Sequence, residues 1–150
     1  MPALSHALLS LTLFGSFLIS GTPLAGTPLS IEVFTTTEFP ISGKGDWRLQ
    51  GASVTVYYVD GLKHFESTLS ESLPNDAQAA KAEALRRIDQ FDGAHMAPAK
   101  NAAIGLTKAV QYGVDRYPAF VFDGRAVVYG VTDLVEALDR HEAWQREQAR

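Results

Sequence analysis

Residues 116–133 read RYPAFVFDGRAVVYGVTD and decide the fold. An apolar run at 119–122 and a mostly apolar stretch at 125–129, which begins with Arg125, flank the pair Asp123-Gly124. Asp-Gly is favoured in two-residue hairpin turns because both turn residues need a positive φ. The stretch therefore predicts a β-hairpin. Both faces of its first arm are apolar, so we expect helices to cover the sheet on both sides.

Two more strands are expected upstream of this hairpin. Residues 31–35 and 54–59 are rich in the residue types that favour strands. The stretch between them, 36–51, holds one proline and three glycines and predicts a loop rather than a helix. Together with the helices described next, these strands predict an α/β domain.

Four helices are expected, because the apolar period changes from two to about 3.6 after Gly61. Pro98 suits the first turn of the third helix, Gly113 suits its end, and Thr132 can cap the last one. The helices are expected over 62–73 (ended by Pro74), 77–91 (capped by Asn75 or Asp76, ended by Asp92-Gly93), 98–112 and from 133 onward. The expected inward positions are Ala99, Ala103, Leu106 and Val110 in the third helix, and Leu134, Leu138, His141 and Trp144 in the last.

The composition excludes several kinds of chemistry. The 150 residues carry a net charge of −4, whereas a nucleic-acid-binding domain usually presents a strongly basic face, so we expect no nucleic-acid partner. The chain has no cysteine and therefore cannot hold a disulfide framework, a zinc–cysteine site, an iron–sulfur cluster or a cysteine nucleophile. The length favours one domain.

The first residues resemble a secretory signal peptide. No Asp, Glu, Lys or Arg precedes Glu32, and residues 7–20 form an apolar run that is shorter than the roughly 20 residues of a bilayer span. Small residues follow around Ala25. We expect residues 1–25 to be a cleaved signal peptide and 26–150 to form one periplasmic domain with no stable membrane span. An uncleaved anchor or a core helix is the alternative.

The dipeptide Tyr117-Pro118, directly ahead of the 119–122 run, resembles a feature of the thioredoxin-like fold. In that fold a proline, usually with a cis peptide bond, precedes the third strand, and a hairpin and a final helix follow. Proline is tolerated as the first residue of a strand, and cis bonds are almost confined to X-Pro. The resemblance implies a thioredoxin-like α/β domain with a mixed sheet, a C-terminal hairpin and helices on both faces; the sequence leaves the cis or trans state of this bond open.

Three blocks resemble a family of small exported proteins encoded in integrating conjugative elements. The blocks are residues 54–61 (VTVYYVDG), 69–74 (LSESLP) and 116–133. That family is similar to TrbC, the F-type pilin-assembly protein, which is exported and thioredoxin-like. The likeness covers residues 30–138. It implies a periplasmic accessory component of a conjugative type IV secretion apparatus that acts through contacts with the other components.

The chain departs from redox-active thioredoxins directly after the first strand. Those proteins carry Cys-x-x-Cys at the start of a helix, whereas residues 34–40 here read FTTTEFP. Thiol–disulfide exchange requires attack by a thiolate, which a threonine hydroxyl cannot replace. We therefore expect a protein that is not an enzyme and that uses no cofactor.

The resemblance also implies a candidate peptide-binding site. In active members of the fold, the loop after the first strand and the proline loop present their backbone to an extended peptide, which binds by strand addition. The matching positions are Thr35, Thr36 and Thr37 on one side and Tyr117 and Pro118 on the other. The alternative is that the threonines only cap a loop and that Tyr117 packs.

Phe39 and Trp47 are candidate interface residues. They lie in a loop rich in proline and glycine, and aromatic side chains are enriched among the residues that dominate binding energy at interfaces. The alternative is that both side chains fold back over the sheet.

The histidines give no sign of a metal site. His64, His95 and His141 fall in different expected helices, without the His-x-x-x-His spacing that places two ligands on one helix face, so we expect no metal. Two alternatives to an assembly protein stay open. One is a cysteine-free enzyme that uses a hydroxyl such as that of Thr36 or Tyr117 on a small thiol or acid, and the other is a general periplasmic holdase.

Overall fold

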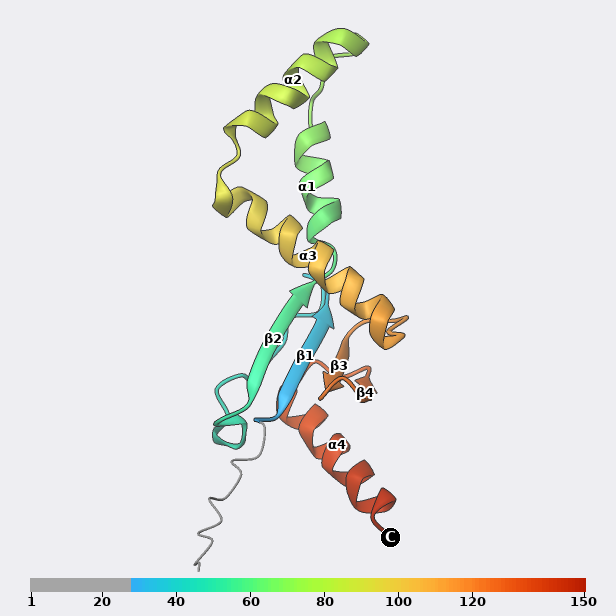
Figure 1. Ribbon diagram of the computed structural model, residues 1–150. Helices are drawn as coiled ribbons and strands as arrows, with labels where there is room; N and C mark the ends of the chain where they lie inside the picture. The colour runs from blue at the N-terminus through green and yellow to red at the C-terminus, as the bar shows by residue number, and fades with distance from the viewer. Residues whose placement is uncertain (1–27) are drawn as a thin grey trace, which may run out of the picture.

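The computed structural model describes residues 28–150. The expected signal peptide, residues 1–25, lies outside the described residues. The strands are β1 (Ser30–Thr35), β2 (Ser53–Tyr58), β3 (Ala119–Phe122) and β4 (Ala126–Tyr129), and the helices are α1 (Gly61–Ser70), α2 (Ala77–Gln90), α3 (Gly93–Tyr112) and α4 (Leu134–Gln148). The strands form one sheet in the order β2-β1-β3-β4 (Figure 1). β1 is parallel to β2 and antiparallel to β3, and β3 is antiparallel to β4.

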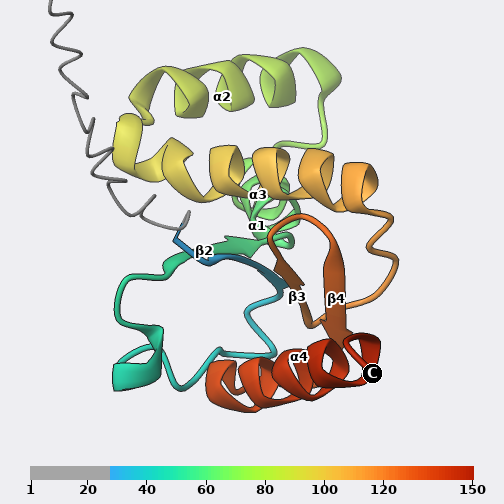
Figure 2. The same cartoon turned by 60° about the horizontal axis from the view of Figure 1, so that its bottom comes forward.

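The sheet lies between α3 on one face and α4 on the other, as Figure 2 shows. All four residues of β3 are buried. Phe120 and Phe122 pack with Leu134 of α4, whereas Ala119 and Val121 pack on the α3 side. This arrangement follows from the apolar character of both faces of β3 and confirms the predicted mixed α/β architecture with helices on both faces.

The hairpin between β3 and β4 forms as predicted, with one change. Asp123 and Gly124 have φ values of 49° and 66°, as the Asp-Gly pair requires. Phe122 pairs with Ala126, however, so Arg125 belongs to the loop and the second arm starts one residue later than expected.

The buried face of α3 differs from the predicted one. Of the expected inward residues only Ala99 is buried, while Leu106 is 36% exposed and Val110 is 81% exposed. A Cβ on Gly105 would lie 2.5 Å from the Cβ of Tyr57 in β2, so α3 approaches the sheet where its side chains are smallest. The buried positions of α3 are Ala99, Ala102, Gly105 and Ala109.

Two helix starts also differ from the sequence prediction. Asp92 does not end α2 but caps α3, where its carboxylate accepts hydrogen bonds from the amides of Ala94 and His95. Pro98 consequently lies inside α3 rather than in its first turn. Asp133, not Thr132, caps α4 by accepting from two backbone amides. In both places a carboxylate satisfies two otherwise free N–H groups of the first turn.

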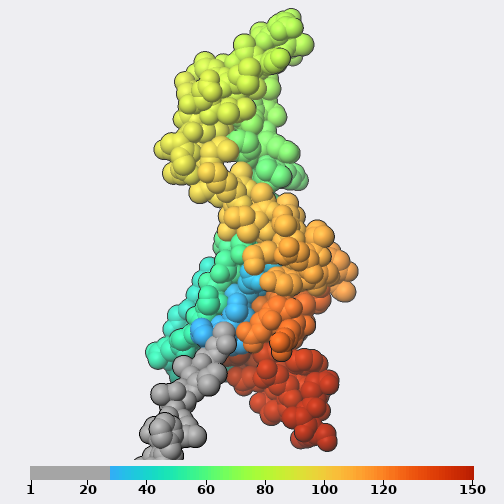
Figure 3. Space-filling view, viewed as in Figure 1, coloured from blue at the N-terminus to red at the C-terminus, as the bar shows by residue number. Residues whose placement is uncertain are grey.

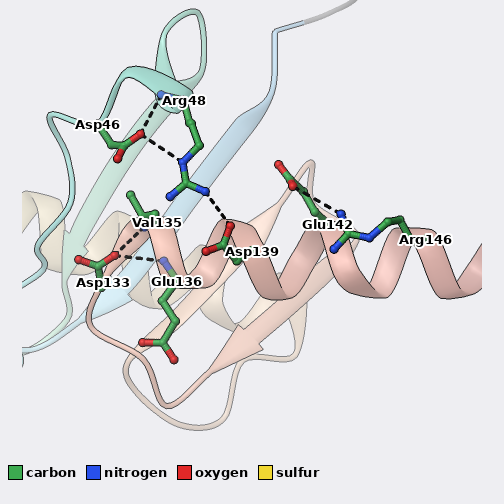
Figure 4. A network of polar contacts seen from close by, with 8 residues as sticks. All are labelled: Asp46, Arg48, Asp133, Val135, Glu136, Asp139, Glu142 and Arg146. Atoms are coloured by element: carbon green, nitrogen blue, oxygen red, sulfur yellow. Dashed lines mark hydrogen bonds and ion pairs between the residues drawn. The ribbon is translucent and has the colours of Figure 1, made fainter.

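The connection from β1 to β2 is a long loop, as predicted, closed by the short 3-10 turn η1 (Trp47–Leu49). Arg48 donates hydrogen bonds to Asp46 at 3.3 Å and to Asp139 of α4 at 2.7 Å (Figure 4). Leu49 enters the core beside α4. The loop is therefore held against α4 by the buried Leu49, by the guanidinium of Arg48, and by Ser42, whose carbonyl accepts from the amide of Leu134 at 3.1 Å.

Helices α1 and α2 project beyond the sheet as an arm (Figure 3). α2 has no buried residue, and Leu85 and Ile88 on its apolar stripe are 53% and 43% exposed. α1 is closely packed at its start, since a Cβ on Gly61 would lie 2.6 Å from the carbonyl oxygen of Pro98. The predicted helices are present in the arm, but the apolar stripe of α2 contributes nothing to the core.

Candidate functional site

The candidate site lies where β1 ends and β3 begins. β1 and β3 are antiparallel, with Phe34 paired to Ala119, so Thr35 lies across from Pro118 and the two loops meet at one end of the sheet. The peptide bond between Tyr117 and Pro118 is cis. The structure thus brings together the two segments that the resemblance pairs.

Two of the three threonines are used within their own loop. Thr35 is fully buried, and its hydroxyl donates to the carbonyl of Phe39 at 2.7 Å. The amide and hydroxyl of Thr37 both donate to Oδ2 of Asp60, at 2.9 and 2.6 Å. For Thr35 and Thr37 the loop-capping alternative therefore describes what the side chains do.

Thr36 and Tyr117, unlike Thr35 and Thr37, have polar groups without a hydrogen-bond partner in the described residues. The Oγ1 atom of Thr36 is buried, and within residues 28–150 it has no hydrogen-bond partner. The half-buried Tyr117 packs against the core on the α3 side, and its backbone amide and carbonyl form no hydrogen bond with the described residues. The peptide unit of Tyr117 thus stays available at this end of the sheet, whereas the oxygen of Thr36 is shielded from solvent.

The ionisable groups of the site are not poised for nucleophilic chemistry. Burial alone would raise the pKa of Asp60, but the hydrogen bonds from Thr37 to its Oδ2 outweigh it and lower that pKa. The other oxygen, Oδ1, is buried and has no hydrogen-bond partner within residues 28–150. Burial raises the pKa of Tyr117, so its phenol stays protonated at neutral pH. The site therefore offers hydrogen bonds rather than an activated nucleophile.

An apolar hollow of about 450 Å³ adjoins the loop, between α1, α3 and the end of β2. It is lined in part by Thr37, Tyr58, His64 and Pro98. Its volume is in the range of ligand pockets, so a bound segment could extend from the loop into it.

Phe39 and Trp47 do not fold back over the sheet. Their side chains are 39% and 73% exposed, and Trp47 sits in the turn that Arg48 and Leu49 fix against α4. A tryptophan held outward on an ordered turn is available for contact with another protein.

The sequence analysis missed a polar cluster at the opposite end of β1. Glu32 binds Lys108 at 2.6 Å and accepts hydrogen bonds from the hydroxyls of Tyr57 and Tyr112. Burial would raise the pKa of Glu32, but Lys108 and the tyrosines lower it, while the pKa of each tyrosine is raised. The signal was available, because Glu32 shares the inward face of its strand with Phe34. Every oxygen of the carboxylate is satisfied, so the cluster fastens α3 to the sheet.

Within residues 28–150, no group of three or more His, Asp or Glu side chains is arranged to hold a metal ion. In the same part of the chain, no helix combines the length and hydropathy needed to cross a bilayer.

A family model described as "Protein of unknown function (DUF1525)" matches residues 29–147. The chain belongs to this family. The matched residues of this DUF1525 member include β1, the whole sheet, the arm and nearly all of α4. Comparisons with curated proteins and with solved structures gave no match.

Proposed function

We propose that the protein is a non-catalytic, exported accessory protein of a conjugative type IV secretion system, and that it acts by binding other proteins. The observation that carries this proposal is the peptide unit of Tyr117, whose amide and carbonyl form no hydrogen bond with residues 28–150. Main-chain groups left open at the end of a sheet are suited to an extended peptide. The strand order and the cis Tyr117-Pro118 bond support the resemblance to the thioredoxin-like fold.

Exposed apolar side chains also favour protein binding. Single exposed hydrophobic residues are ordinary, but larger groups of them mark interaction surfaces. The large apolar side chains that are at least 36% exposed are Phe39, Trp47, Leu62, Leu85, Ile88, Ile104, Leu106, Val110 and Trp144. They occur on the loop, the arm, α3 and α4, so several faces can meet a partner.

The enzyme alternative depends on an activated hydroxyl. The pKa values of Tyr57, Tyr112 and Tyr117 are all raised, which keeps these phenols protonated and makes them poor bases or nucleophiles. Thr36 is the hydroxyl on which that alternative depends. The holdase alternative predicts binding without a preferred surface.

Conjugal transfer from cells that carry the element separates these proposals. We expect cells with Thr36→Ala to transfer the element at nearly the frequency of the parent. The double variant Phe39→Ala/Trp47→Ala is expected to lower the transfer frequency at least about tenfold, because it removes two exposed aromatic contacts. Lys44→Ala/Gln50→Ala, which changes two exposed polar residues of the same loop, is the matched control and is expected to transfer like the parent. A Thr36→Ala loss as deep as that of the gene deletion favours the enzyme. Full transfer by the aromatic double variant contradicts binding through this loop.

Export is tested separately. Mass spectrometry of protein recovered from the periplasm is expected to show a new amino terminus between Gly21 and Thr27. Recovery of the chain with Met1 intact, or only from the cytoplasm, contradicts the proposed location.

A further inference from the structure

The two edge strands of the sheet, β2 and β4, differ in how their outward backbone groups are hydrogen-bonded. Val59 donates to the carbonyl of Thr35 at 2.9 Å, so the odd-numbered residues of β2 face β1 and the even-numbered ones face outward. The side chain of Asn101 in α3 occupies this outer edge. Its Oδ1 accepts from the amide of Tyr58 at 2.9 Å, and its Nδ2 donates to the carbonyl of Val56 at 3.0 Å. One side-chain amide thus satisfies two of the outward backbone groups at the C-terminal end of this edge.

The outer edge of β4 has no such cover. Gly130 donates to the carbonyl of Pro118 at 3.2 Å, so by alternation Val127 and Tyr129 turn their N–H and C=O groups outward. These groups form no hydrogen bond with residues 28–150. β4 itself contains neither proline nor a charged residue, which are the usual protection of an open strand edge. A strand can therefore pair here.

A hollow of about 320 Å³ lies directly beside this edge, between β4 and α4. Ala126 and Val128 form one wall, and His141 and Trp144 form the other. The ring of His141 stacks on Phe122 with centroids 4.2 Å apart, and Trp144 is 46% exposed. Alternate side chains of an added strand would point toward α4, and the hollow is suited to one of aliphatic or aromatic type.

Charge defines a further feature of the ligand. Arg125 lines the hollow at the hairpin end, and it forms no ion pair with any carboxylate of the described residues. The neighbouring Asp123 instead accepts a hydrogen bond from the amide of Ser30 at 2.9 Å. A carboxylate of a bound segment could form charge-assisted hydrogen bonds with the guanidinium of Arg125.

We propose that the open edge of β4 is a docking site for an extended acidic segment of a partner protein. The segment pairs with Val127 and Tyr129, inserts an apolar side chain between β4 and α4, and places a carboxylate at Arg125. Main-chain bonds supply the affinity, and the hollow and Arg125 supply the sequence preference. This site shares no residue with the one at Thr36 and Tyr117, so either can fail without the other.

Selection of short random peptides displayed on phage, with the full-length protein as bait, tests the site. Peptides are counter-selected on Val127→Pro, which removes an N–H that faces outward and therefore breaks no internal sheet bond. The survivors are expected to alternate apolar and polar residues and to carry an acid at one end. Synthetic copies should bind Val127→Pro at least about tenfold more weakly than the parent protein in calorimetry. Val54→Pro, at an outward position of β2, is the matched control and is expected to bind normally.

Arg125→Glu keeps the test decisive if the proline variant does not fold, as judged by circular dichroism. It is expected to bind the selected peptides at least about tenfold more weakly, and to recover when their acid is replaced by lysine. The proposal is overturned if no peptide survives the counter-selection, or if the survivors bind Val127→Pro and Arg125→Glu as well as the parent. It is also overturned if sedimentation shows a dimer that Val127→Pro dissociates, because the edge then serves a second copy.

Discussion

The sheet and the projecting arm are stabilised by different means. In β3 every side chain is at most 1% exposed, with helices on both faces. In α2 no residue is buried, and the helix is held by polar contacts: Asp76 caps it, and Arg87 donates to the carbonyls of Leu69 and Glu71 at 3.1 and 2.6 Å. Apolar burial therefore stabilises the sheet, whereas α2 is held by polar contacts and leaves Leu85 and Ile88 exposed.

The largest expected effect comes from emptying the core of the sheet. Phe120→Ala removes a fully buried ring between the sheet and α4 and should lower the free energy of unfolding by about 3–5 kcal/mol. Ile88→Ala, at a 43% exposed position of α2, should cost less than about 1 kcal/mol. Urea unfolding followed by circular dichroism measures both. Similar losses of unfolding free energy in Phe120→Ala and Ile88→Ala would contradict the proposed difference between the sheet and the arm.

A smaller effect is expected where α3 joins the two regions. Gly105→Ala places a Cβ against that of Tyr57 and must push α3 away from β2, which should cost about 1–3 kcal/mol. Gly93→Ala is the matched control, because a Cβ there meets nothing within 4 Å. Equal unfolding midpoints for the two alanine variants would show that the close approach at Gly105 is not required.

The arm itself should respond locally. Arg87→Ala removes the guanidinium that binds the last carbonyls of α1, so amide hydrogen exchange in α2 should become faster while the global free energy of unfolding changes by about 1 kcal/mol or less. Arg86, which hydrogen-bonds only Glu83 of its own helix, supplies the control as Arg86→Ala. Unchanged exchange in α2 would rule out Arg87 as the tie between the two helices.

The smallest expected effect is a pH dependence of folding stability that arises from His141, which packs against the sheet. Burial against Phe122 lowers the pKa of His141, although Asp123 and Glu142 oppose it. The unfolded chain then takes up a proton before the folded one, so stability falls as the pH drops through the ordinary histidine value of about 6.5. His141→Gln should flatten this slope in unfolding titrations. An unchanged slope in His141→Gln would assign it to other groups.

The sequence was most informative where the apolar pattern was strong. The apolar residues on both faces of β3 and the Asp-Gly turn after it predicted the centre of the sheet correctly. Few structures other than a buried hairpin strand are compatible with both features. In α3 the same approach failed, since Leu106 and Val110 dominate the hydropathy pattern while the true contact face is made of alanine and glycine. Small residues contribute little hydropathy, yet they decide how closely a helix can approach a sheet.

The candidate site was predictable in part. The Thr35–Thr37 segment meets Tyr117 and Pro118 because β1 and β3 are antiparallel, and the resemblance to the thioredoxin-like fold, rather than the residue pattern, implied this meeting. Which threonine stays free depended on Asp60, a residue 23 positions away from Thr37. The Glu32 cluster likewise joins three elements that only the folded chain brings together. Pairings of this kind leave no periodic trace in the sequence.

The amide of Asn101 has a consequence for how copies of this protein can associate. A fibre that grows head to tail needs two receptive borders on every molecule, and the β2 border is already occupied from within at Val56 and Tyr58. Continuous edge-to-edge association of neighbouring copies is therefore hindered at this end of β2. A single asparagine thus acts against fibre growth, while the docking site proposed at β4 stays open.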